Sequence, residues 1–242
     1  EKNLSDVKII DSSWHMPQTK RNGYDEFKSK HIPGSIFFDL DKNSDLNTHL
    51  PHMLVKINDW ESIISNMGIQ NNDRIVVYDN SDVISSCRCW FNFIYYGHDP
   101  KLIHVLNGGL EKWLKEKREI TNTSLTSKIS KYKGEEKKEL VKNKITIDHN
   151  IKTKNFKVID ARSYERFEGK IPEPRKGLRS GSIKNSLCLP FNNCLNNDKT
   201  FKNKNELKKV FETCLENTNE RNIVFSCGSG VTAYVLALAY SL

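Results

Sequence analysis

The stretch IVFSCGSGVTA, residues 223–233, joins a short β-branched run to an apolar segment of helical length, and one cysteine stands at the junction. The run before Cys227 is typical of a buried strand, and the segment Tyr234 to Tyr240 is typical of a helix. Small residues follow the cysteine. A backbone that curls from a strand end into a helix N-terminus offers N–H donors to negative charge, so Cys227 is predicted to be a stabilised thiolate. The alternative is a cysteine that only packs in the core.

The same pattern occurs twice in the chain. Residues 73–79 (DRIVVYD) match residues 220–227 (ERNIVFSC), and the two segments lie about 150 residues apart. Self-similarity at one fixed spacing indicates an internal repeat. The first copy carries Asp79 at the position of Cys227. We therefore expect one half with a nucleophile and one half without.

Each half of the repeat predicts an α/β domain. Short β-branched runs alternate with helix-length segments such as Trp60 to Met67 and Lys204 to Leu215, which is typical of parallel strands joined by crossover helices. Residues 121–138 are rich in Ser, Thr and Lys with little apolar periodicity, which indicates an exposed connector. We predict one domain over residues 1–120, a linker over 121–138 and a second domain over 139–242, each with a parallel sheet flanked by helices.

The two halves of the repeat differ at their ends. The first half continues past its loop through a strand, Leu102 to Leu106, and a helix, Gly109 to Lys115, whereas the second half stops at this point. The second half has an extra segment, Ile145 to Ile151, before its first strand, whereas only six residues precede Val7. We therefore expect a chain truncated at both ends, with a second domain that is incomplete at its C-terminus and a fold of reduced stability.

Composition narrows the class of protein. The chain has 242 residues, of which 37% are hydrophobic and 28% charged, which suits a globular fold with a sizeable core. The formal net charge is +8, but the lysines are spread over both halves and form no stripe, so we expect no nucleic-acid partner. No apolar run approaches the ~18 residues of a membrane span, so no membrane partner is expected.

The cysteines and the chain start bear on the compartment. The six cysteines show neither a C-x-x-C pair nor the spacing of a zinc site, so reduced thiols and no metal are expected. Cys87 and Cys89 are expected to be helix-face residues and not a redox pair. The start at Glu1 lacks the features of a signal peptide, which favours the cytoplasm, with the mitochondrial matrix as the alternative.

Five motifs together resemble the two-domain rhodanese superfamily, over essentially the whole chain. They are Asp11 to Pro17 (DSSWHMP), His31 to Ser35 (HIPGS), Leu106 to Gly109 (LNGG), Glu173 to Arg175 (EPR) and Cys227 to Ala233 (CGSGVTA). Within this family the C-G-S-G-V-T loop resembles that of 3-mercaptopyruvate sulfurtransferases, whereas thiosulfate sulfurtransferases usually carry C-R-K-G-V-T. The difference has a physical reason, because the thiosulfate dianion favours cations in the loop, and Gly228 and Ser229 are neutral.

The resemblance implies a set of site residues. Arg166 and Arg175 stand where the family holds the substrate's carboxylate and keto oxygen, a task that suits guanidinium groups. In the first half, Asp41 and His52 match residues proposed in the family to form a serine-protease-like relay with the loop's Ser229. The remaining loop residues are expected to bind the substrate and stabilise charge on the sulfur; they are Gly228, Gly230, Val231 and Thr232.

The implied reaction is sulfur transfer. Cys227 would take the sulfur of 3-mercaptopyruvate, release pyruvate and pass the persulfide sulfur to a thiol, such as that of thioredoxin, or to cyanide. No cofactor is expected, and the protein is expected to be a monomer. The alternatives are a thiosulfate:cyanide sulfurtransferase and a non-catalytic persulfide carrier or interaction module. A phosphatase of similar fold is excluded, because it needs an arginine six residues after the cysteine, where this chain has Ala233.

One turn departs from the family pattern. Where the second domain of the family often reads G-H-I-P-G, this chain reads GSIKN at residues 181–185. The histidine, proline and glycine of the turn are therefore missing, and we expect an altered loop geometry there without loss of chemistry.

Overall fold

The structure is a computed structural model that describes residues 7–215 and 222–242. The chain divides into two compact units, unit 1 (Glu1–Leu140) and unit 2 (Val141–Leu242). Part of one matched repeat segment, residues 220–221, lies outside the described residues.

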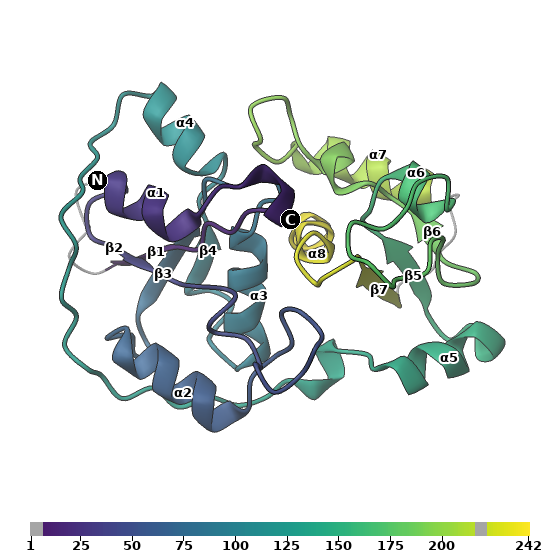
Figure 1. Cartoon of the computed structure of the whole chain (residues 1–242), viewed down its shortest axis with the longest axis horizontal. Helices are drawn as coiled ribbons and strands as arrows, with labels where there is room; N and C mark the ends of the chain where they lie inside the picture. Colours follow the sequence, from purple (N-terminus) through teal and green to yellow (C-terminus); the bar gives the residue numbers. More distant parts are fainter. Residues whose placement is uncertain (1–6, 216–221) are drawn as a thin grey trace. The chain divides into compact units, whose positions relative to one another are not determined.

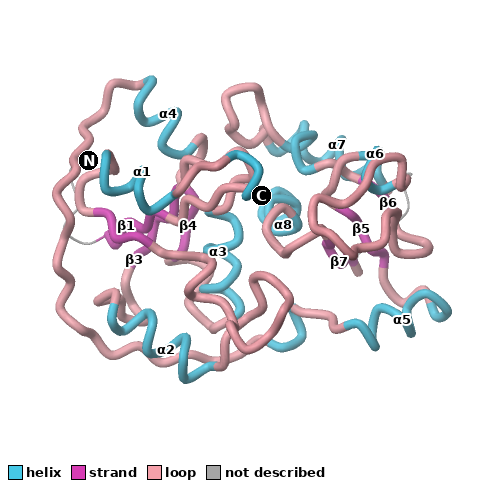
Figure 2. The backbone as a smooth tube through the Cα atoms, viewed as in Figure 1, coloured by secondary structure: helices cyan, strands magenta, loops and turns pink. Residues whose placement is uncertain are grey.

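The described residues of unit 1 form a parallel sheet of four strands in the order β2-β1-β3-β4 (Figures 1 and 2). The strands are β1 (Val7–Asp11), β2 (Ser35–Phe37), β3 (Arg74–Tyr78) and β4 (Ile103–Val105). The helices are η2 (Pro17–Thr19), α1 (Gly23–Ser29), α2 (Ile57–Asn66), α3 (Ser86–Tyr95), α4 (Gly109–Lys115) and η3 (Lys138–Leu140). Crossover helices join the parallel strands, as the alternating pattern of the sequence predicts.

Helices cover both faces of this sheet. In Figure 1, α1 and α4 lie on one side and α2 and α3 on the other. The α2–α3 side has an aromatic core, in which Trp60 stacks on Tyr96 with ring centroids 4.4 Å apart and meets Phe93 edge-on at 5.2 Å. Burial of these large rings holds the layer together, since each removes a large apolar area from water.

Unit 2 repeats the arrangement with fewer strands. Its described residues form a three-stranded parallel sheet in the order β6-β5-β7. The strands are β5 (Lys157–Asp160), β6 (Leu187–Cys188) and β7 (Ile223–Ser226). The helices are α5 (Lys144–Thr153), α6 (Tyr164–Phe167), η4 (Phe191–Cys194), α7 (Lys204–Cys214) and α8 (Ala233–Ser241). In the described part of unit 2, β4 and α4 have no counterpart.

Strand register confirms the internal repeat. In unit 1, Asp11 at the end of β1 pairs with Tyr78 of β3, and in unit 2 Asp160 at the end of β5 pairs with Ser226 of β7. Asp79 and Cys227 are therefore structurally equivalent, as the sequence predicts.

The segment 121–138 differs from the expected exposed connector, because part of it packs on unit 1. Tyr132 is buried, its backbone N–H donates to Ser65 Oγ at 3.0 Å, and the hydroxyl of Ser130 donates to the carbonyl of Ile69 at 2.5 Å. Further on, the backbone N–H of Glu135 donates to Tyr96. These contacts come from single residues without periodicity, so the pattern that indicates a helix or strand could not reveal them.

The turn before β6 keeps the geometry of its counterpart in unit 1, so the expected change of loop geometry at residues 181–185 is wrong. In unit 1, Ser35 donates from its backbone N–H and its hydroxyl to the carbonyl of Ile32; in unit 2, Ser186 does the same to Ile183. The backbone φ angle is +82° at Gly34 and +66° at Asn185. Asparagine tolerates this left-handed conformation, so the turn survives the loss of glycine.

Candidate active site

Cys227 follows the last residue of β7 and precedes the loop that enters α8. Its side chain is half-buried and contacts the apolar core of unit 2. Gly230 has a φ of +70°, Val231 is 2% exposed, and Thr232 is the N-cap residue of α8. The loop therefore runs from a strand end to a helix N-terminus, which is the geometry that favours negative charge at the sulfur.

Arg175 lies beside this loop. Its Nη2 donates a hydrogen bond to the carbonyl oxygen of Gly228 at 2.5 Å. Within residues 7–215 and 222–242, Arg175 forms no ion pair with an acidic side chain. The guanidinium therefore keeps its positive charge available next to Cys227.

Arg166, on α6, lies against the same glycine. A Cβ atom added to Gly228 would stand 2.8 Å from Arg166 Nη2, so the guanidinium occupies the space where a side chain would be. Glu173 holds this guanidinium in place, accepting from Arg166 Nε at 3.1 Å and from Nη2 at 2.6 Å. Both arginines named from the sequence thus meet at the residue after the candidate nucleophile.

A third arginine, the half-buried Arg162, extends this network. Arg162 donates from Nη1 to Glu173 at 2.7 Å and from Nη2 to Asp160 at 2.6 Å. The side chains of Glu173 and Asp160 are only 4% and 5% exposed. Hydrogen bonding to Arg166 in the first place, with help from Arg162, lowers the pKa of Glu173 below its usual value. Two arginines and two carboxylates therefore form a charge-balanced cluster. Sequence reasoning assigned no role to Arg162 or Glu173, although both lie within or beside the quoted motifs.

In unit 1, the structure brings together the two residues of the proposed relay that belong to this unit. His52 Nε2 lies 3.0 Å from Asp41 Oδ1, and Trp14 Nε1 donates to the same oxygen at 3.0 Å. The hydrogen bond from His52 lowers the pKa of Asp41. Arg88 donates to the carbonyl of His52 at 2.6 Å, which supports the left-handed backbone at this residue, where φ is +57°.

Ser229 belongs to unit 2, whereas Asp41 and His52 belong to unit 1. Each part of the relay is described within its own unit, and the role of Ser229 in the relay stays a prediction. Asp41 and His52 form a pair with the geometry of a carboxylate that orients an imidazole.

Four of the other cysteines are poor candidates for the nucleophile. Burial raises the pKa of the Cys188 and Cys194 thiols to about 12, and it raises those of Cys87 and Cys89 further still. A protonated, buried thiol is inert as a nucleophile. Cys87 and Cys89 lie on α3, as expected for helix residues, and both are free thiols.

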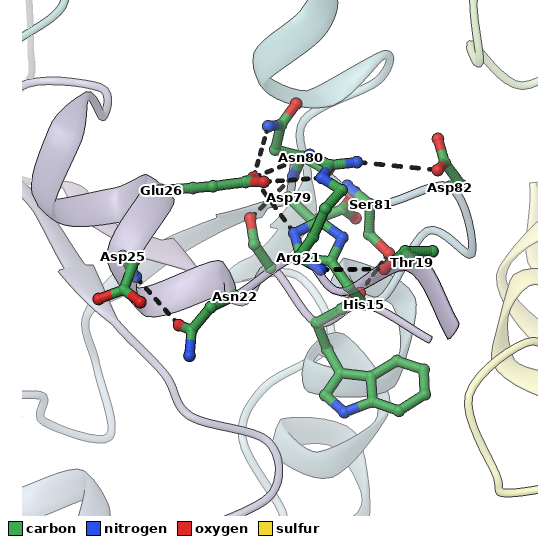
Figure 3. A network of polar contacts seen from close by, with 12 residues as sticks. His15, Thr19, Arg21, Asn22, Asp25, Glu26, Asp79, Asn80, Ser81 and Asp82 are labelled. Carbon is green, nitrogen blue, oxygen red and sulfur yellow. Dashed lines mark hydrogen bonds and ion pairs between the residues drawn. The ribbon is translucent and has the colours of Figure 1, made fainter. Parts of the chain in front are cut away.

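Unit 1 has a polar network at the position equivalent to the Cys227 loop (Figure 3). The carboxylate of Asp79 accepts from the backbone N–H groups of Ser81 and Ser86, both at 2.8 Å. Arg21 forms a two-point ion pair with Glu26, at 2.7 and 2.8 Å, and its Nη2 also donates to the carbonyl of Asn80 at 3.0 Å. The side chains around this loop therefore satisfy one another.

Neither a candidate metal-binding cluster nor a membrane-spanning helix occurs among residues 7–215 and 222–242. They contain no group of three or more His, Cys, Asp or Glu side chains that could hold a metal ion. Among the helices described, none is long and apolar enough to cross a membrane.

Comparison with known proteins identifies the family. The model of the rhodanese-like domain matches residues 2–116 and 145–241. The Arabidopsis thaliana protein named thiosulfate/3-mercaptopyruvate sulfurtransferase 1, mitochondrial, is 37% identical over 254 residues, and the alignment covers 96% of this chain and 66% of the relative. The chain thus spans about two thirds of that relative's length.

Animal relatives carry both substrate names. The mouse 3-mercaptopyruvate sulfurtransferase is 33% identical over 94% of this chain and 76% of its own length. The rat thiosulfate sulfurtransferase is also 33% identical, over 96% of this chain and 78% of its own length.

A solved structure agrees in fold. SseA from Escherichia coli, described with the rhodanese fold and catalytic mechanism of 3-mercaptopyruvate sulfotransferases, superposes with a TM-score of 0.88 at 27% identity, covering 99% of this chain and 90% of that one. With two rhodanese-like matches and relatives of both substrate names, the chain belongs to the rhodanese family, as a two-domain enzyme of the 3-mercaptopyruvate/thiosulfate sulfurtransferase type.

Proposed function

We propose that this protein transfers the sulfur of 3-mercaptopyruvate through a persulfide on Cys227. The observation that carries the proposal is the convergence of Arg166 and Arg175 on Gly228, the residue after Cys227. An α-keto acid has a carboxylate and a keto oxygen, and two guanidinium groups can bind both of them. The thiol sulfur of the substrate would then lie near the cysteine.

In the proposed first step, the thiolate of Cys227 attacks the sulfur of mercaptopyruvate. A sulfur–sulfur bond forms, the carbon–sulfur bond breaks, and its electron pair leaves with the carbon as the enolate of pyruvate. The proton of the transferred thiol returns to this enolate, which gives pyruvate and an enzyme persulfide anion. The loop from Gly228 to Thr232 would stabilise the charge on the sulfur.

The relay supplies a route for that proton. We propose that Ser229 passes it, with His52 as the base and Asp41 as the residue that orients the imidazole. The 3.0 Å contact between His52 and Asp41 supports this assignment. Sulfur leaves the enzyme when an acceptor thiol, such as that of reduced thioredoxin, attacks the outer sulfur of the persulfide and restores the thiolate.

Thiosulfate is the second candidate donor, because relatives of similar identity are named for it. The neutral loop argues against it as the preferred donor. Gly228 offers no cation to a sulfonate, and the space a larger side chain would need at this position is occupied by Arg166.

Steady-state kinetics with both donors test the proposal. We expect a higher kcat/KM with 3-mercaptopyruvate than with thiosulfate, measured by pyruvate release and by thiocyanate formation with cyanide as acceptor. More efficient turnover of thiosulfate would refute the substrate assignment, and the absence of turnover with either donor would favour a carrier role.

The comparisons also bear on the compartment. The Arabidopsis relative is named as mitochondrial, which is compatible with a mitochondrial location, and no finding supports the cytoplasm. Fractionation of cells that express the full-length protein with a C-terminal tag tests this assignment.

A further inference from the structure

We propose that Glu173 is a positioning residue for substrate recognition, because it fixes the guanidinium of Arg166 against Gly228. The inference rests on the proposed function, in which Arg166 binds the α-keto acid. Glu173 is itself too enclosed to bind substrate, since its side chain is 4% exposed.

The hydrogen bonds of Glu173 restrict Arg166 in rotation as well as in place. Oε1 accepts from Arg166 Nε at 3.1 Å, and Oε2 accepts from Arg166 Nη2 at 2.6 Å. A two-point contact of this kind defines the plane of the guanidinium. Oε1 also accepts from Arg162 Nη1 at 2.7 Å, and Arg162 is held in turn by Asp160. The carboxylate is therefore anchored by a second arginine besides Arg166.

This anchoring leaves one part of Arg166 available. Among the described residues, Nη1 of Arg166 has no hydrogen-bond partner, and the side chain is 22% exposed. A long, unrestrained arginine side chain loses considerable rotamer freedom when it binds a ligand, and Glu173 removes that freedom before the substrate arrives. The free nitrogen then faces a substrate oxygen in one fixed orientation.

The glycine after the nucleophile fits the same account. Arg166 Nη2 would stand 2.8 Å from a Cβ at position 228. An unrestrained arginine could yield to such an atom at little cost, but Glu173 prevents the movement. Gly228 is thus required by the fixed position of Arg166, and we expect the effects of Gly228 and Glu173 substitutions to be coupled.

If Glu173 acted only through its charge, Glu173→Gln would strengthen substrate binding, whereas a positioning role predicts that it weakens binding. Arg162 and Arg166 balance Asp160 and Glu173 in charge, so Glu173→Gln leaves one extra positive charge near the substrate. Electrostatics alone would then strengthen the binding of an anionic substrate. A positioning role predicts weaker binding, since glutamine has a single acceptor oxygen and cannot hold both guanidinium nitrogens.

Kinetics with 3-mercaptopyruvate separate the two roles. We expect Glu173→Gln to raise KM about tenfold with a change in kcat below about threefold. Glu173→Asp retains the charge but is shorter by one methylene group, and we expect it to raise KM at least ~threefold. An unchanged or lower KM in the glutamine variant would overturn the proposal. If that variant does not fold, a wild-type KM in the aspartate variant would overturn it instead.

The matched control lies in unit 1. Glu26 holds Arg21 by the same two-point contact, but it contacts Asn80, which follows Asp79 and not a cysteine (Figure 3). Glu26→Gln removes an equivalent interaction from the repeat, and we expect it to leave KM within about twofold of wild type.

A chemical probe tests positioning without sulfur transfer. Iodoacetate carries a carboxylate and iodoacetamide does not, so the ratio of their rates of alkylation at Cys227 reports carboxylate binding beside the thiol. We expect Glu173→Gln to lower this ratio about fivefold and Glu26→Gln to leave it unchanged. An unchanged ratio in the Glu173 variant would overturn the positioning role even if wild type uses mercaptopyruvate. A lowered ratio in a protein that does not use mercaptopyruvate would leave Glu173 as a positioning residue and refute the proposed function.

A double-mutant cycle examines the link to Gly228. We expect Gly228→Ala to lower kcat/KM about tenfold in wild type and less than ~threefold in the Glu173→Gln background, where Arg166 can move aside. Effects that multiply independently would show that Glu173 does not hold Arg166 against the glycine.

Discussion

In unit 1, β3 ends at Tyr78 and is followed by Asp79; in unit 2, β7 ends at Ser226 and is followed by Cys227. The strand register makes these positions equivalent, yet the chemistry differs. The Asp79 carboxylate accepts from two backbone N–H groups of its own loop, so unit 1 supplies an internal anion where unit 2 has a thiol.

The arginines beside the two loops show the same difference. Arg21 in unit 1 and Arg175 in unit 2 each donate to the carbonyl of the residue after the equivalent position, Asn80 and Gly228 respectively. Arg21 is neutralised by Glu26, whereas no acidic side chain of the described residues pairs with Arg175. The same backbone arrangement therefore has its arginine paired with a carboxylate in unit 1 and leaves an arginine without an acidic partner among the described residues of unit 2.

The largest expected effect comes from that unpaired cation. Arg175→Ala should lower kcat/KM for 3-mercaptopyruvate by roughly a hundredfold or more, because a guanidinium–carboxylate pair with two hydrogen bonds is lost at ~1.5–3 kcal/mol each. Arg21→Ala is the matched control and should stay within about twofold of wild type. Equal losses in both variants, measured by pyruvate release, would contradict the distinction between the two arginines.

The equivalent aspartates at the ends of β1 and β5, Asp11 and Asp160, should differ in how they make the free energy of unfolding depend on pH. Asp160 is followed by its partner Arg162, whereas the equivalent Asp11 has Ser13 there. Burial raises the pKa of Asp11 from 3.8 to about 6, and the charge of Asp79 acts in the same direction. Since this pKa is higher in the fold than in the unfolded chain, the stabilising contribution of Asp11 is full below about pH 4 and is lost as the pH rises through about 6.

Asp11→Asn removes this titration. Between pH 4 and pH 7 the variant should gain about 2–3 kcal/mol of unfolding free energy relative to wild type. Urea titrations of both proteins at the two pH values measure the change, and a stability difference that does not vary with pH would exclude the assigned pKa.

We expect the carboxylate of Asp79 to stabilise the fold of unit 1. The two carboxylate oxygens of Asp79 each accept from one backbone N–H, that of Ser81 or that of Ser86. Asp79→Asn keeps only one acceptor oxygen, so we expect the free energy of unfolding to fall by about 1–3 kcal/mol. Cys227→Ser at the equivalent position should cost less than ~1 kcal/mol. Urea unfolding monitored by circular dichroism compares them, and equal losses would mean that Asp79 does not close its loop.

The smallest expected effect concerns donor preference. The double substitution Gly228→Arg and Ser229→Lys places two cations in the loop and displaces Arg166, which lies where a side chain at position 228 would begin. We expect the ratio of kcat/KM for thiosulfate to that for 3-mercaptopyruvate to rise about tenfold. A ratio that stays constant or falls would argue against loop charge as the determinant of donor choice.

Much of the fold could be predicted from the sequence because the same alternation of strand-like and helix-like segments occurs in both halves of the chain. The helix 109–115 has the predicted bounds, the strand predicted over 102–106 is observed as β4, and the helix α7 ends within one residue of its prediction. Such segments are strongly periodic or β-branched. The packing of Tyr132 was missed because a single apolar residue among Ser, Thr and Lys carries no period.

Residues of the candidate site can be named from the sequence where residue type alone limits the chemistry, and their roles stay predictions. Cys227 stands out as a thiol at a strand-to-helix turn, and Arg166 and Arg175 were found through the motifs around them. Glu173 was missed because a carboxylate near arginines has the same appearance in the sequence whether it is exposed or buried. Only the contacts show that it is enclosed and shared between Arg162 and Arg166.

The most direct test of the account is mass spectrometry of the protein after incubation with 3-mercaptopyruvate and no acceptor. We expect the mass to increase by one sulfur atom, with the adduct on the peptide that contains Cys227 and with release of an equal amount of pyruvate. The Cys227→Ser variant should show neither, and Cys188 and Cys194, whose thiol pKa values are both raised to about 12, should remain unmodified. An adduct on another cysteine, or pyruvate release by the serine variant, would contradict the assignment of Cys227 as the residue that carries the sulfur.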